Sequence, residues 1–337
     1  MIRLSISNIR KFPSPTFLFP NVKFLNMEPP ARKFERKKSF LLGTALLLIL
    51  GFFALILLFV AFTYVLPQFM GKCVAVVNVD MPISVEGQPS SLFSTGYAGS
   101  EGMAKSIKSL NKRDDVAAVL FVFNSPGGSV VASREIYSAV KALNKPKVSF
   151  FREMAASGAY YIAAGTDYIV SDPDALTGSI GVIATFTDMS GLLEKIGVNV
   201  TSVTSGPHKD IGSSTRPMDE EELTIFRALI QEVFDEFKGV VVENRKSKLN
   251  AALFEEVLDG RILTGRQAKA VGLVDTTGSK DDALKKAADL GGISYESVDD
   301  IRVCEVQTTP QETGLLGAST VFRFFSNLPN TYSLNFR

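Results

Sequence analysis

The fold is decided where Val116–Phe123 (VAAVLFVF) leads through Asn124–Ser129 (NSPGGS) into Val130–Leu143 (VVASREIYSAVKAL) and then Lys147–Phe151 (KVSFF). The first and last segments are short apolar runs, which are typical of buried strands, and Val130–Leu143 has apolar residues near a 3.6-residue period. A strand, a helix and a second strand in this order form a βαβ unit. The stretch therefore predicts an α/β domain.

The same alternation continues on both sides of this stretch. Further strands are predicted at Cys73–Val79, Tyr168–Val170, Ile180–Phe186 and Val198–Val203, and helices at Glu101–Lys112, Ser157–Ala164 and Leu192–Ile196. The pattern changes at Asp219–Arg245, a long amphipathic helix whose acidic first residues suit the positive end of its dipole. Helical stretches follow at 250–258, 265–270 and 279–289. The chain beyond Pro310 has little pattern, and we find no internal repeat.

The chain has 337 residues, and its formal net charge of +1 conceals an uneven distribution. Residues 1–38 carry nine Lys and Arg against two acidic residues, whereas residues 39–337 carry 27 against 33. The two parts therefore have net charges of +7 and −6. A nucleic-acid-binding protein would show a basic face or stripe with interleaved aromatic residues. We expect no nucleic-acid partner.

One histidine, His208, and two cysteines, Cys73 and Cys304, are present. These are too few for a zinc site made of four cysteines, two cysteines with two histidines, or three histidines. We expect neither a metal nor a cofactor. The two cysteines lie far apart and follow no spacing pattern, so we interpret them as small apolar strand residues rather than as a disulfide.

An apolar segment from Phe40 to Val65 runs for 26 residues without a charge. At about 1.5 Å per residue, a helix of this length more than crosses a bilayer core. A cleaved signal peptide is the alternative, but its apolar region usually runs for about 7 to 15 residues and ends in small residues at a cleavage site. Tyr64–Gln68 offers no such site. We therefore predict a transmembrane anchor over residues 40–66.

Basic residues precede this segment and are scarce after it: Arg32, Lys33, Arg36, Lys37 and Lys38 come before, and only Lys72 follows closely. The positive-inside rule then places the N-terminus in the cytoplasm. We expect a single-pass protein of the cytoplasmic (inner) membrane, with residues 1–39 as a basic cytoplasmic segment and the remainder outside. Residues 1–30 show no period, which suggests the hypothesis that translation starts at Met27.

Paired glycines mark the first of three stretches that join small residues to a potential catalytic group. Gly127 and Gly128 follow a buried strand and open a helix. Backbone amides there can approach a ligand closely, and the start of the helix favours developing negative charge. The stretch suits an oxyanion hole. An ordinary tight turn between a strand and a helix is the alternative.

Ser157 lies in the second stretch, Met154–Tyr161 (MAASGAYY), where a helix is predicted to begin among small residues. A serine at this place can be the N-cap of the helix, because its hydroxyl accepts a hydrogen bond from a free backbone N–H. It can equally be a nucleophile at a crowded strand-to-helix junction. The residue itself leaves both interpretations open.

Lys209 lies in the third stretch, Ser205–Ser213 (SGPHKDIGS), a loop after a predicted strand. A lysine can remove the proton of a serine only if burial or nearby positive charge keeps it largely unprotonated. A surface lysine paired with Asp210 is the alternative. His208 adjoins Lys209, but neighbours in an extended loop point apart, so we assign His208 a surface or substrate-groove role rather than that of the base.

Together the three stretches resemble the signal peptide peptidase A (SppA, protease IV) family of membrane-anchored serine proteases, in the Clp protease/crotonase superfamily. The resemblance covers roughly residues 72–290. It rests on five ordered motifs: NSPGGSV at 124–130, MAASGAYY at 154–161, TGSIGV at 177–182, SGPHKDIGS at 205–213 and GRILTGRQAKAVGLVD at 260–275. One departure is that Ala159 stands where the family commonly has a second glycine after the Ser-Gly pair.

The resemblance implies a role for each of five residues. Ser157 is similar to the nucleophile and Lys209 to the general base of a Ser-Lys dyad, and Ser179 to a residue that hydrogen-bonds the lysine. The backbone N–H groups of Gly128 and Gly158 are similar to oxyanion-hole donors. The resemblance further implies a Clp protease/crotonase-like fold of repeated ββα units with a C-terminal helical extension. We therefore expect a Ser-Lys peptidase domain over residues 71–290 and a C-terminal tail over residues 291–337.

The resemblance also implies partners and a substrate class. By this resemblance, small single-repeat members form dome- or ring-shaped oligomers in which the serine and the lysine of one site come from adjacent subunits. We therefore expect a homo-oligomer next to the membrane lipid. The predicted function is that of a serine endopeptidase that cleaves hydrophobic peptides, such as remnant signal peptides, bound as an added strand. A crotonase-like acyl-CoA enzyme and a non-catalytic anchored scaffold are the alternatives.

Overall fold

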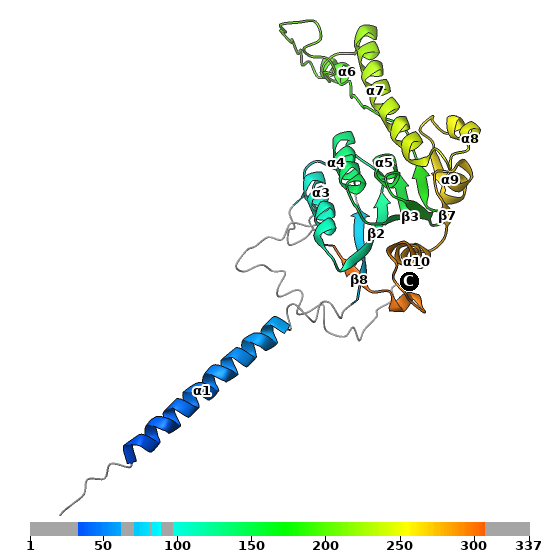
Figure 1. The fold of residues 1–337 in the computed structure, drawn as a ribbon. Coiled ribbons are helices and arrows are strands. Elements are labelled where there is room, and N and C mark those ends of the chain that lie inside the picture. The colour runs from blue at the N-terminus through cyan, green and yellow to red at the C-terminus, as the bar shows by residue number, and fades with distance from the viewer. Residues whose placement is uncertain (1–32, 62–70, 81, 89–96, 307–337) are drawn as a thin grey trace, which may run out of the picture. The chain divides into compact units, whose positions relative to one another are not determined.

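A computed structural model describes residues 33–61, 71–80, 82–88 and 97–306 (Figure 1). The chain divides into two compact units with a boundary after Leu66, and each is described by itself. The hypothesis that translation starts at Met27, and the patternless end of the tail, concern residues outside the described ranges.

Helix α1 (Lys33–Val60) belongs to the first unit. Large apolar side chains between Leu46 and Val60 are exposed, with Leu48 at 75%. Within the described residues, no helix meets the combined requirement of length and apolarity for crossing a membrane. The anchor predicted over residues 40–66 is therefore not confirmed and stays a prediction.

The second unit is built on one sheet, to which the described residues contribute eight strands. The path of paired strands runs β6-β5-β3-β2-β1-β8, and β4 pairs with β3 and β7. All pairs are parallel except β5 with β6. The strands are β1 (Cys73–Asp80), β2 (Val116–Ser125), β3 (Lys147–Ala156), β4 (Tyr168–Ser171), β5 (Leu176–Gly178), β6 (Ile262–Thr264), β7 (Thr276–Thr277) and β8 (Val303–Glu305).

Helices cover both faces of this sheet (Figure 1). Side chains alternate along each strand, so Val119 and Phe121 of β2 pack on the face that carries α3, α4 and α5, whereas Leu120 packs on the face that carries α10. The α/β prediction is confirmed. The helices are α3 (Ser100–Ser109), α4 (Val130–Lys141), α5 (Gly158–Ala163), α6 (Ser190–Lys195), α7 (Glu220–Arg245), α8 (Ala251–Glu256), α9 (Gly265–Val271) and α10 (Lys280–Gly291), with short 3-10 turns η2 (Leu110–Lys112) and η3 (Val298–Asp300).

The third strand divides its pairing between two neighbours. The first half of β3 pairs with β4, and its last residues pair with β5, with Ala156 opposite Gly178. The strands β5 to β8 were not predicted, because each has only two or three residues and such a length gives no readable period. Their pairing nevertheless brings the end of β3 beside the end of β5.

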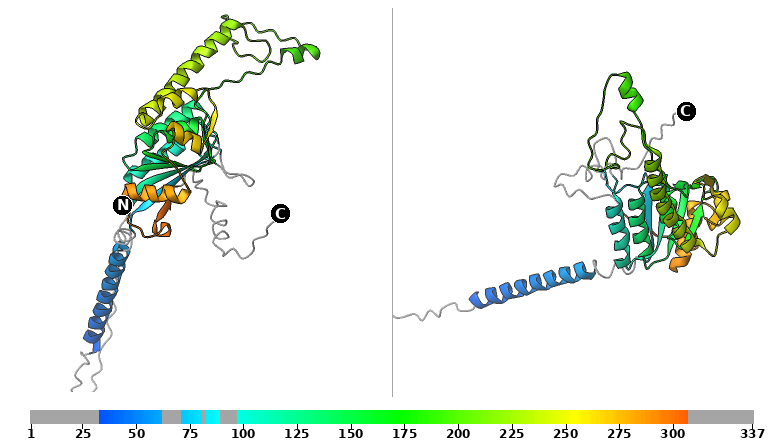
Figure 2. Two further views of the ribbon diagram at one scale, coloured as in Figure 1. Left: turned by 90° about the vertical axis from the view of Figure 1, so that its right-hand side faces the viewer. Right: turned by 90° about the horizontal axis from the view of Figure 1, so that it is seen from above.

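Two predicted strands, Ile180–Phe186 and Val198–Val203, are wrong. The structure assigns no strand at either place: Ile180 is buried, and residues 181–186 and 198–203 lie within a segment that we call the arm (residues 181–218). The arm contains α6 and projects from the sheet beside the first turns of α7 (Figures 1 and 2). A strand needs a neighbour to pair its backbone groups, and the arm has none in its own chain among the described residues. Its apolar side chains are exposed, with Ile183 at 86% and Val203 at 96%.

Buried polar groups hold α5 and the end of α7 to the rest of the second unit. The hydroxyl of Tyr160 on α5 donates to the carbonyl of Leu273 at 2.9 Å. At the end of α7, Nη1 of Arg245 lies 2.7 Å from Oδ2 of Asp275, and both side chains are buried. Removing one partner of a buried ion pair leaves an uncompensated charge. The GLVD segment at 272–275 therefore stabilises the packing of α5 and α7.

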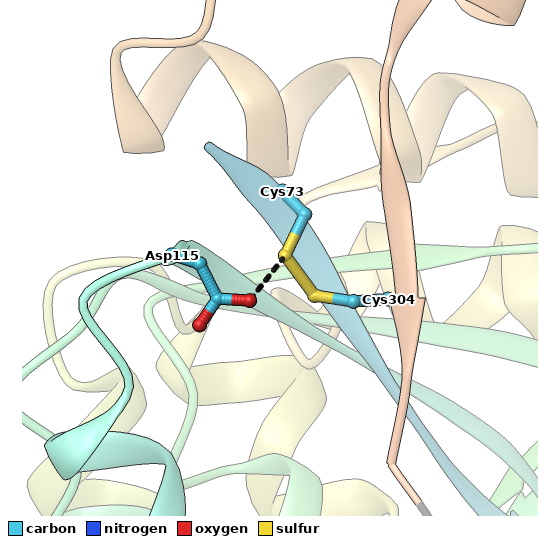
Figure 3. A group of neighbouring side chains, drawn as sticks. All are labelled: Cys73, Asp115 and Cys304. Atoms are coloured by element: carbon cyan, nitrogen blue, oxygen red, sulfur yellow. Dashed lines mark hydrogen bonds between the residues drawn. A yellow bond between two sulfur atoms is a disulfide. The ribbon is translucent and has the colours of Figure 1, made fainter. Parts of the chain in front are cut away.

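The two cysteines form a disulfide, so their interpretation as separate apolar residues is wrong. Cys73 opens β1 and Cys304 lies in the neighbouring parallel strand β8, with Cα atoms 5.9 Å apart (Figure 3). This separation is normal for a disulfide. The sequence separation is 231 residues, so no local spacing pattern could reveal the pair. The bond fastens the edge strand β8, which lies beyond residue 290, to the sheet.

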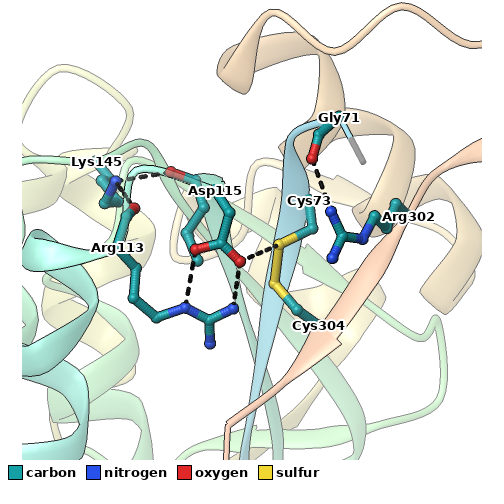
Figure 4. Close-up of a disulfide and its surroundings, with 8 residues drawn as sticks. Gly71, Cys73, Arg113, Asp115, Lys145, Arg302 and Cys304 are labelled. Atoms are coloured by element: carbon teal, nitrogen blue, oxygen red, sulfur yellow. Dashed lines mark hydrogen bonds and ion pairs between the residues drawn. A yellow bond between two sulfur atoms is a disulfide. The ribbon is translucent and has the colours of Figure 1, made fainter. Parts of the chain in front are cut away.

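Charged residues surround the disulfide (Figure 4). Oδ2 of Asp115 lies 3.8 Å from Sγ of Cys73. The guanidinium of Arg113 donates to both oxygens of this carboxylate, at 3.1 and 2.6 Å, and thereby holds the pKa of Asp115 below its ordinary value. On the other side, Arg302 donates to the carbonyl of Gly71 at 2.8 Å. Polar contacts and the disulfide thus hold the same edge of the sheet.

Replacing both cysteines by serine should lower the free energy of unfolding by roughly 2–5 kcal/mol, because the disulfide restricts the unfolded chain over a long loop. Urea unfolding followed by circular dichroism measures the change. Dithiothreitol should lower the urea midpoint of the wild type and leave that of Cys73→Ser/Cys304→Ser unchanged. Equal midpoints for the two proteins without reductant would contradict a stabilising disulfide.

Candidate active site

Ser157 lies between the end of β3 and the start of α5, in an unusual backbone conformation. Its φ is 52° and its ψ is −123°, and a positive φ is uncommon for any residue other than glycine. Strained positions of this kind concentrate at functional sites. Its backbone N–H donates to the carbonyl of Gly178 at 2.9 Å, and its side chain makes no cap hydrogen bond to α5. Ser157 therefore occupies the N-cap position of α5, but its hydroxyl does not cap the helix and is available for another role.

The paired glycines pack directly against this junction. Gly127 has a φ of 96°, which glycine adopts at little cost. A Cβ on Gly127 would lie 2.7 Å from the backbone nitrogen of Gly158 and 2.9 Å from Cβ of Ser157. Only glycine permits this approach, so the residue does more than form an ordinary tight turn.

The segment that follows β1 in the sequence holds the glycine loop from the other side, where Ile83 forms a parallel bridge with Gly128. The N–H of Ile83 donates to the carbonyl of Gly127, and the N–H of Ser129 donates to the carbonyl of Ile83, both at 2.8 Å. A Cβ on Gly128 would collide with the carbonyl of Ile83. The backbone of Gly128 is thus held from both sides.

Two backbone N–H groups at this junction have no acceptor in the part of the chain that the structure describes. Among the backbone hydrogen bonds of the described residues, none has the N–H of Gly128 or Gly158 as its donor. The nitrogen of Gly128 lies 3.4 Å from the position that a Cβ of Gly158 would take. Unpaired donors held in place beside a serine can stabilise an oxyanion that forms when the serine attacks a carbonyl. The arrangement therefore has the chemistry that an acyl-transfer site requires.

Ser179 follows β5 at the same end of the sheet. Its φ is 49°, and its N–H donates to the carbonyl of Arg261 at 2.9 Å. Because Ala156 pairs with Gly178 in parallel register, Ser157 and Ser179 follow directly on neighbouring strands. The structure thus brings together four of the five predicted site residues: Ser157, Ser179, Gly128 and Gly158.

Lys209 is not brought to them within one chain. It lies in the arm, its side chain is exposed, and its Nζ forms no hydrogen bond or ion pair with any described residue. Asp210, the alternative partner, is instead paired with Arg216, whose Nη2 lies 2.7 Å from Oδ1. Nε2 of His208 lies 3.5 Å from Oε1 of Glu221. A salt-bridged Lys209–Asp210 pair is therefore absent from the described part of the chain.

Ser133, in the first turn of α4, is a neighbour of the site that sequence reasoning missed. The residue is 3% exposed, and within the described residues its Oγ is the only buried side-chain oxygen or nitrogen without a hydrogen-bond partner. A Cβ on Gly158 would collide with this oxygen. The pair of small residues Ala132 and Ser133 was the available signal, because small residues allow two helices to approach closely.

Gly158→Ala should lower both stability and activity, because the added methyl group overpacks the contact between α4 and α5, typically by about 1–3 kcal/mol. Removing the opposing oxygen in Gly158→Ala/Ser133→Ala should restore most of the thermal midpoint. Differential scanning fluorimetry with an activity assay measures both effects. An equally low midpoint in the double variant would refute the collision as the cause.

Comparisons with known proteins give consistent matches. Residues 139–294 match the family model described as Peptidase family S49, and residues 97–170 match the Clp protease model. A protein of Methanocaldococcus jannaschii named as a protease is 42% identical over 191 residues, 56% of this chain and 61% of that protein. A Synechocystis protein named as a protease is 39% identical over 201 residues, 59% of this chain and 72% of that one.

A third relative, from Enterococcus faecium, is named as a signal peptide peptidase SppA. It is 37% identical over 235 residues, which are 67% of this chain and 67% of that protein. The chain thus spans between 61% and 72% of the length of these three relatives.

Proposed function

Because the chain belongs to peptidase family S49, we propose that it is a serine endopeptidase whose nucleophile is Ser157 and whose general base is Lys209. The observation that carries the proposal is the junction at Ser157. Its hydroxyl makes no cap hydrogen bond and lies beside the amides of Gly128 and Gly158, for which the described residues offer no backbone acceptor. The family membership supports peptide hydrolysis as the reaction, and the geometry at Ser157, Gly128 and Gly158 supports a nucleophile beside an oxyanion hole.

The reaction proceeds in two acyl-transfer steps. Neutral Lys209 accepts the proton of the Ser157 hydroxyl as its oxygen attacks the peptide carbonyl, and the amides of Gly128 and Gly158 donate to the resulting oxyanion. The protonated lysine then gives its proton to the leaving amine, which departs. In the second step the same lysine activates a water molecule that hydrolyses the ester on Ser157. Ser179 hydrogen-bonds the lysine and orients it.

The proposed dyad forms between two copies of the chain, in a homo-oligomer. Two features support this arrangement: Lys209 lies in the projecting arm without a partner in its own chain among the described residues, and exposed apolar side chains of the same arm, such as Ile183 and Val203, offer surface to bury against a second copy. An arm that docks on the next subunit would carry Lys209 with it. Activity would then require assembly.

We propose attachment to the outer face of the cytoplasmic membrane and apolar peptides, such as signal peptide remnants, as substrates. The uncharged run from Phe40 to Val65 and the basic residues before it support the attachment. The disulfide supports an oxidising compartment for the second unit. Alkaline extraction of membranes should leave the chain in the pellet, and its release into the supernatant would refute the anchor.

The full chain, purified in detergent, should cleave an apolar signal-like peptide and cleave the same peptide more slowly after two central leucines are replaced by lysine. Mass spectrometry of the products measures both rates. Equal rates would contradict an apolar groove. Turnover of an acyl-CoA thioester without any peptide cleavage would favour the crotonase-like alternative, and neither activity would favour the scaffold.

A further inference from the structure

A cluster of charged side chains joins the Lys209 loop to the start of α7. Arg216 is at its centre and binds two carboxylates at once. Its Nε and Nη2 donate to Asp210 at 3.0 and 2.7 Å, and its Nη1 donates to Glu222 at 2.9 Å. The Glu222 side chain is only 1% exposed. Bidentate pairs of this kind fix geometry as well as charge.

Glu222 also belongs to the first turn of α7, so the cluster is anchored in regular structure. Its N–H donates to the side chain of Asp219 at 2.8 Å, and the N–H of Asp219 donates back to Glu222 at 3.1 Å. This reciprocal pair is a capping box. Arg216 therefore ties Asp210, and with it the backbone that carries Lys209, to the end of a helix of 26 residues.

The cluster also decides the charge next to Lys209. Hydrogen bonds from Arg216 hold the pKa of Asp210 and of Glu222 below their ordinary values, so both carboxylates are ionised at neutral pH. With Arg216 between them, the three side chains have a net charge of −1. Without Arg216, Asp210 would be an unpaired carboxylate directly beside Lys209, and such a neighbour favours the ammonium form of a lysine.

The other charged groups at this end of the arm have partners of their own. His208 faces Glu221 at 3.5 Å, and Glu220 lies 3.8 Å from Arg227. The carboxylate of Asp219 accepts the N–H of Glu222. These groups stay the same when only Asp210 or Arg216 is changed, so a difference between such variants reports on this one pair.

We propose that Arg216 is a positioning residue for Lys209. By binding Asp210, Arg216 ties the loop that carries Lys209 to the first turn of α7, and it keeps the lysine free of a carboxylate partner when the lysine meets Ser157. The proposal rests on the proposed function, in which Lys209 is the base. A protein that used Asp210 to bind Lys209 would hold its base as a protonated ion pair. Arg216 prevents that pairing by occupying the carboxylate.

The test measures the pH at which peptidase activity is half-maximal on its rising limb, in the full chain. Arg216→Ala leaves a net charge of −2 on the remaining carboxylates and should move this pH upward. Activity at neutral pH should then fall about tenfold for every whole pH step by which the limb moves. Asp210→Asn leaves the cluster neutral and should move the pH downward. The double variant Arg216→Ala/Asp210→Asn restores a net charge of −1 and should return the pH close to that of the wild type.

Arg266→Ala is the matched control, because Arg266 pairs with Asp174 on the surface, away from the arm. Its pH profile should equal that of the wild type. Thermal unfolding of every variant separates a displaced profile from a lost fold. If Arg216→Ala does not fold, Asp210→Asn still tests the positioning role, because Arg216 stays paired with Glu222 in that variant. The proposal still requires the pH of half-maximal activity to move downward.

An unchanged pH profile in folded Arg216→Ala and Asp210→Asn would overturn the positioning role, and so would a double variant that stays as displaced as Arg216→Ala. A merely structural Arg216 would lower activity at every pH by the same factor. Full activity in Lys209→Ala would instead overturn the proposed function, so the two failures are distinguishable.

Discussion

Ser157→Ala should abolish peptide cleavage, with a loss of about 10³-fold or more, while the protein keeps its fold and its oligomeric state. Removal of a catalytic serine takes away covalent catalysis and with it most of the rate. The amides of the oxyanion hole remain and account for the small residual rate. The side chain makes no cap hydrogen bond that stabilises α5. Alanine should therefore cost little stability, although the positive φ of residue 157 remains strained.

Peptide cleavage by mass spectrometry, together with thermal unfolding, measures this result. Ser138→Ala is the matched control, because Ser138 is an exposed serine of α4 whose hydroxyl donates only to the carbonyl of Arg134. Its activity should equal that of the wild type. A folded Ser157→Ala protein that cleaves peptide at the wild-type rate would remove Ser157 from the mechanism.

The fold could be predicted from the sequence wherever a segment was long enough to show a period. The strands β1 and β2 and the helices α4 and α7 lie close to their predicted ranges, whereas β3 begins where predicted but continues five residues further, to Ala156. The short strands β5 to β8 could not be predicted, since their pairing depends on neighbours that are distant in sequence. The apolar residues 181–186 and 198–203 of the arm were wrongly predicted as strands, because apolar side chains that are exposed in one chain give the same pattern as a buried strand.

The motifs and the family resemblance indicated the residues of the candidate site, but not their geometry. Only the structure shows that the Ser157 hydroxyl makes no cap hydrogen bond, and its role as the nucleophile stays a prediction. The roles of Ser133 and Arg216 depend on contacts with Gly158 and Glu222 that no local pattern shows. The disulfide escaped prediction for the same reason, since Cys73 and Cys304 meet only when β8 joins the sheet.

The second large effect concerns the dyad between subunits. Lys209→Ala should be as inactive as Ser157→Ala, because each variant lacks one of two groups that act in the same step. In a mixed oligomer, a site is complete where a subunit with intact Ser157 meets a neighbour with intact Lys209. Random mixing at equal amounts completes about a quarter of the sites in a closed ring with one site at each interface. The mixture should therefore regain about a quarter of the wild-type activity.

Co-expression of Ser157→Ala and Lys209→Ala chains, each with a different affinity tag, provides the most direct test of a site shared between subunits. Tandem purification isolates the mixed oligomers, and the rate of peptide cleavage is compared with that of each variant alone. We predict activity of about a quarter of the wild-type rate in the mixed species, by the random-mixing argument above, and none in either single variant. Mixed oligomers that are as inactive as the single variants would contradict the shared dyad.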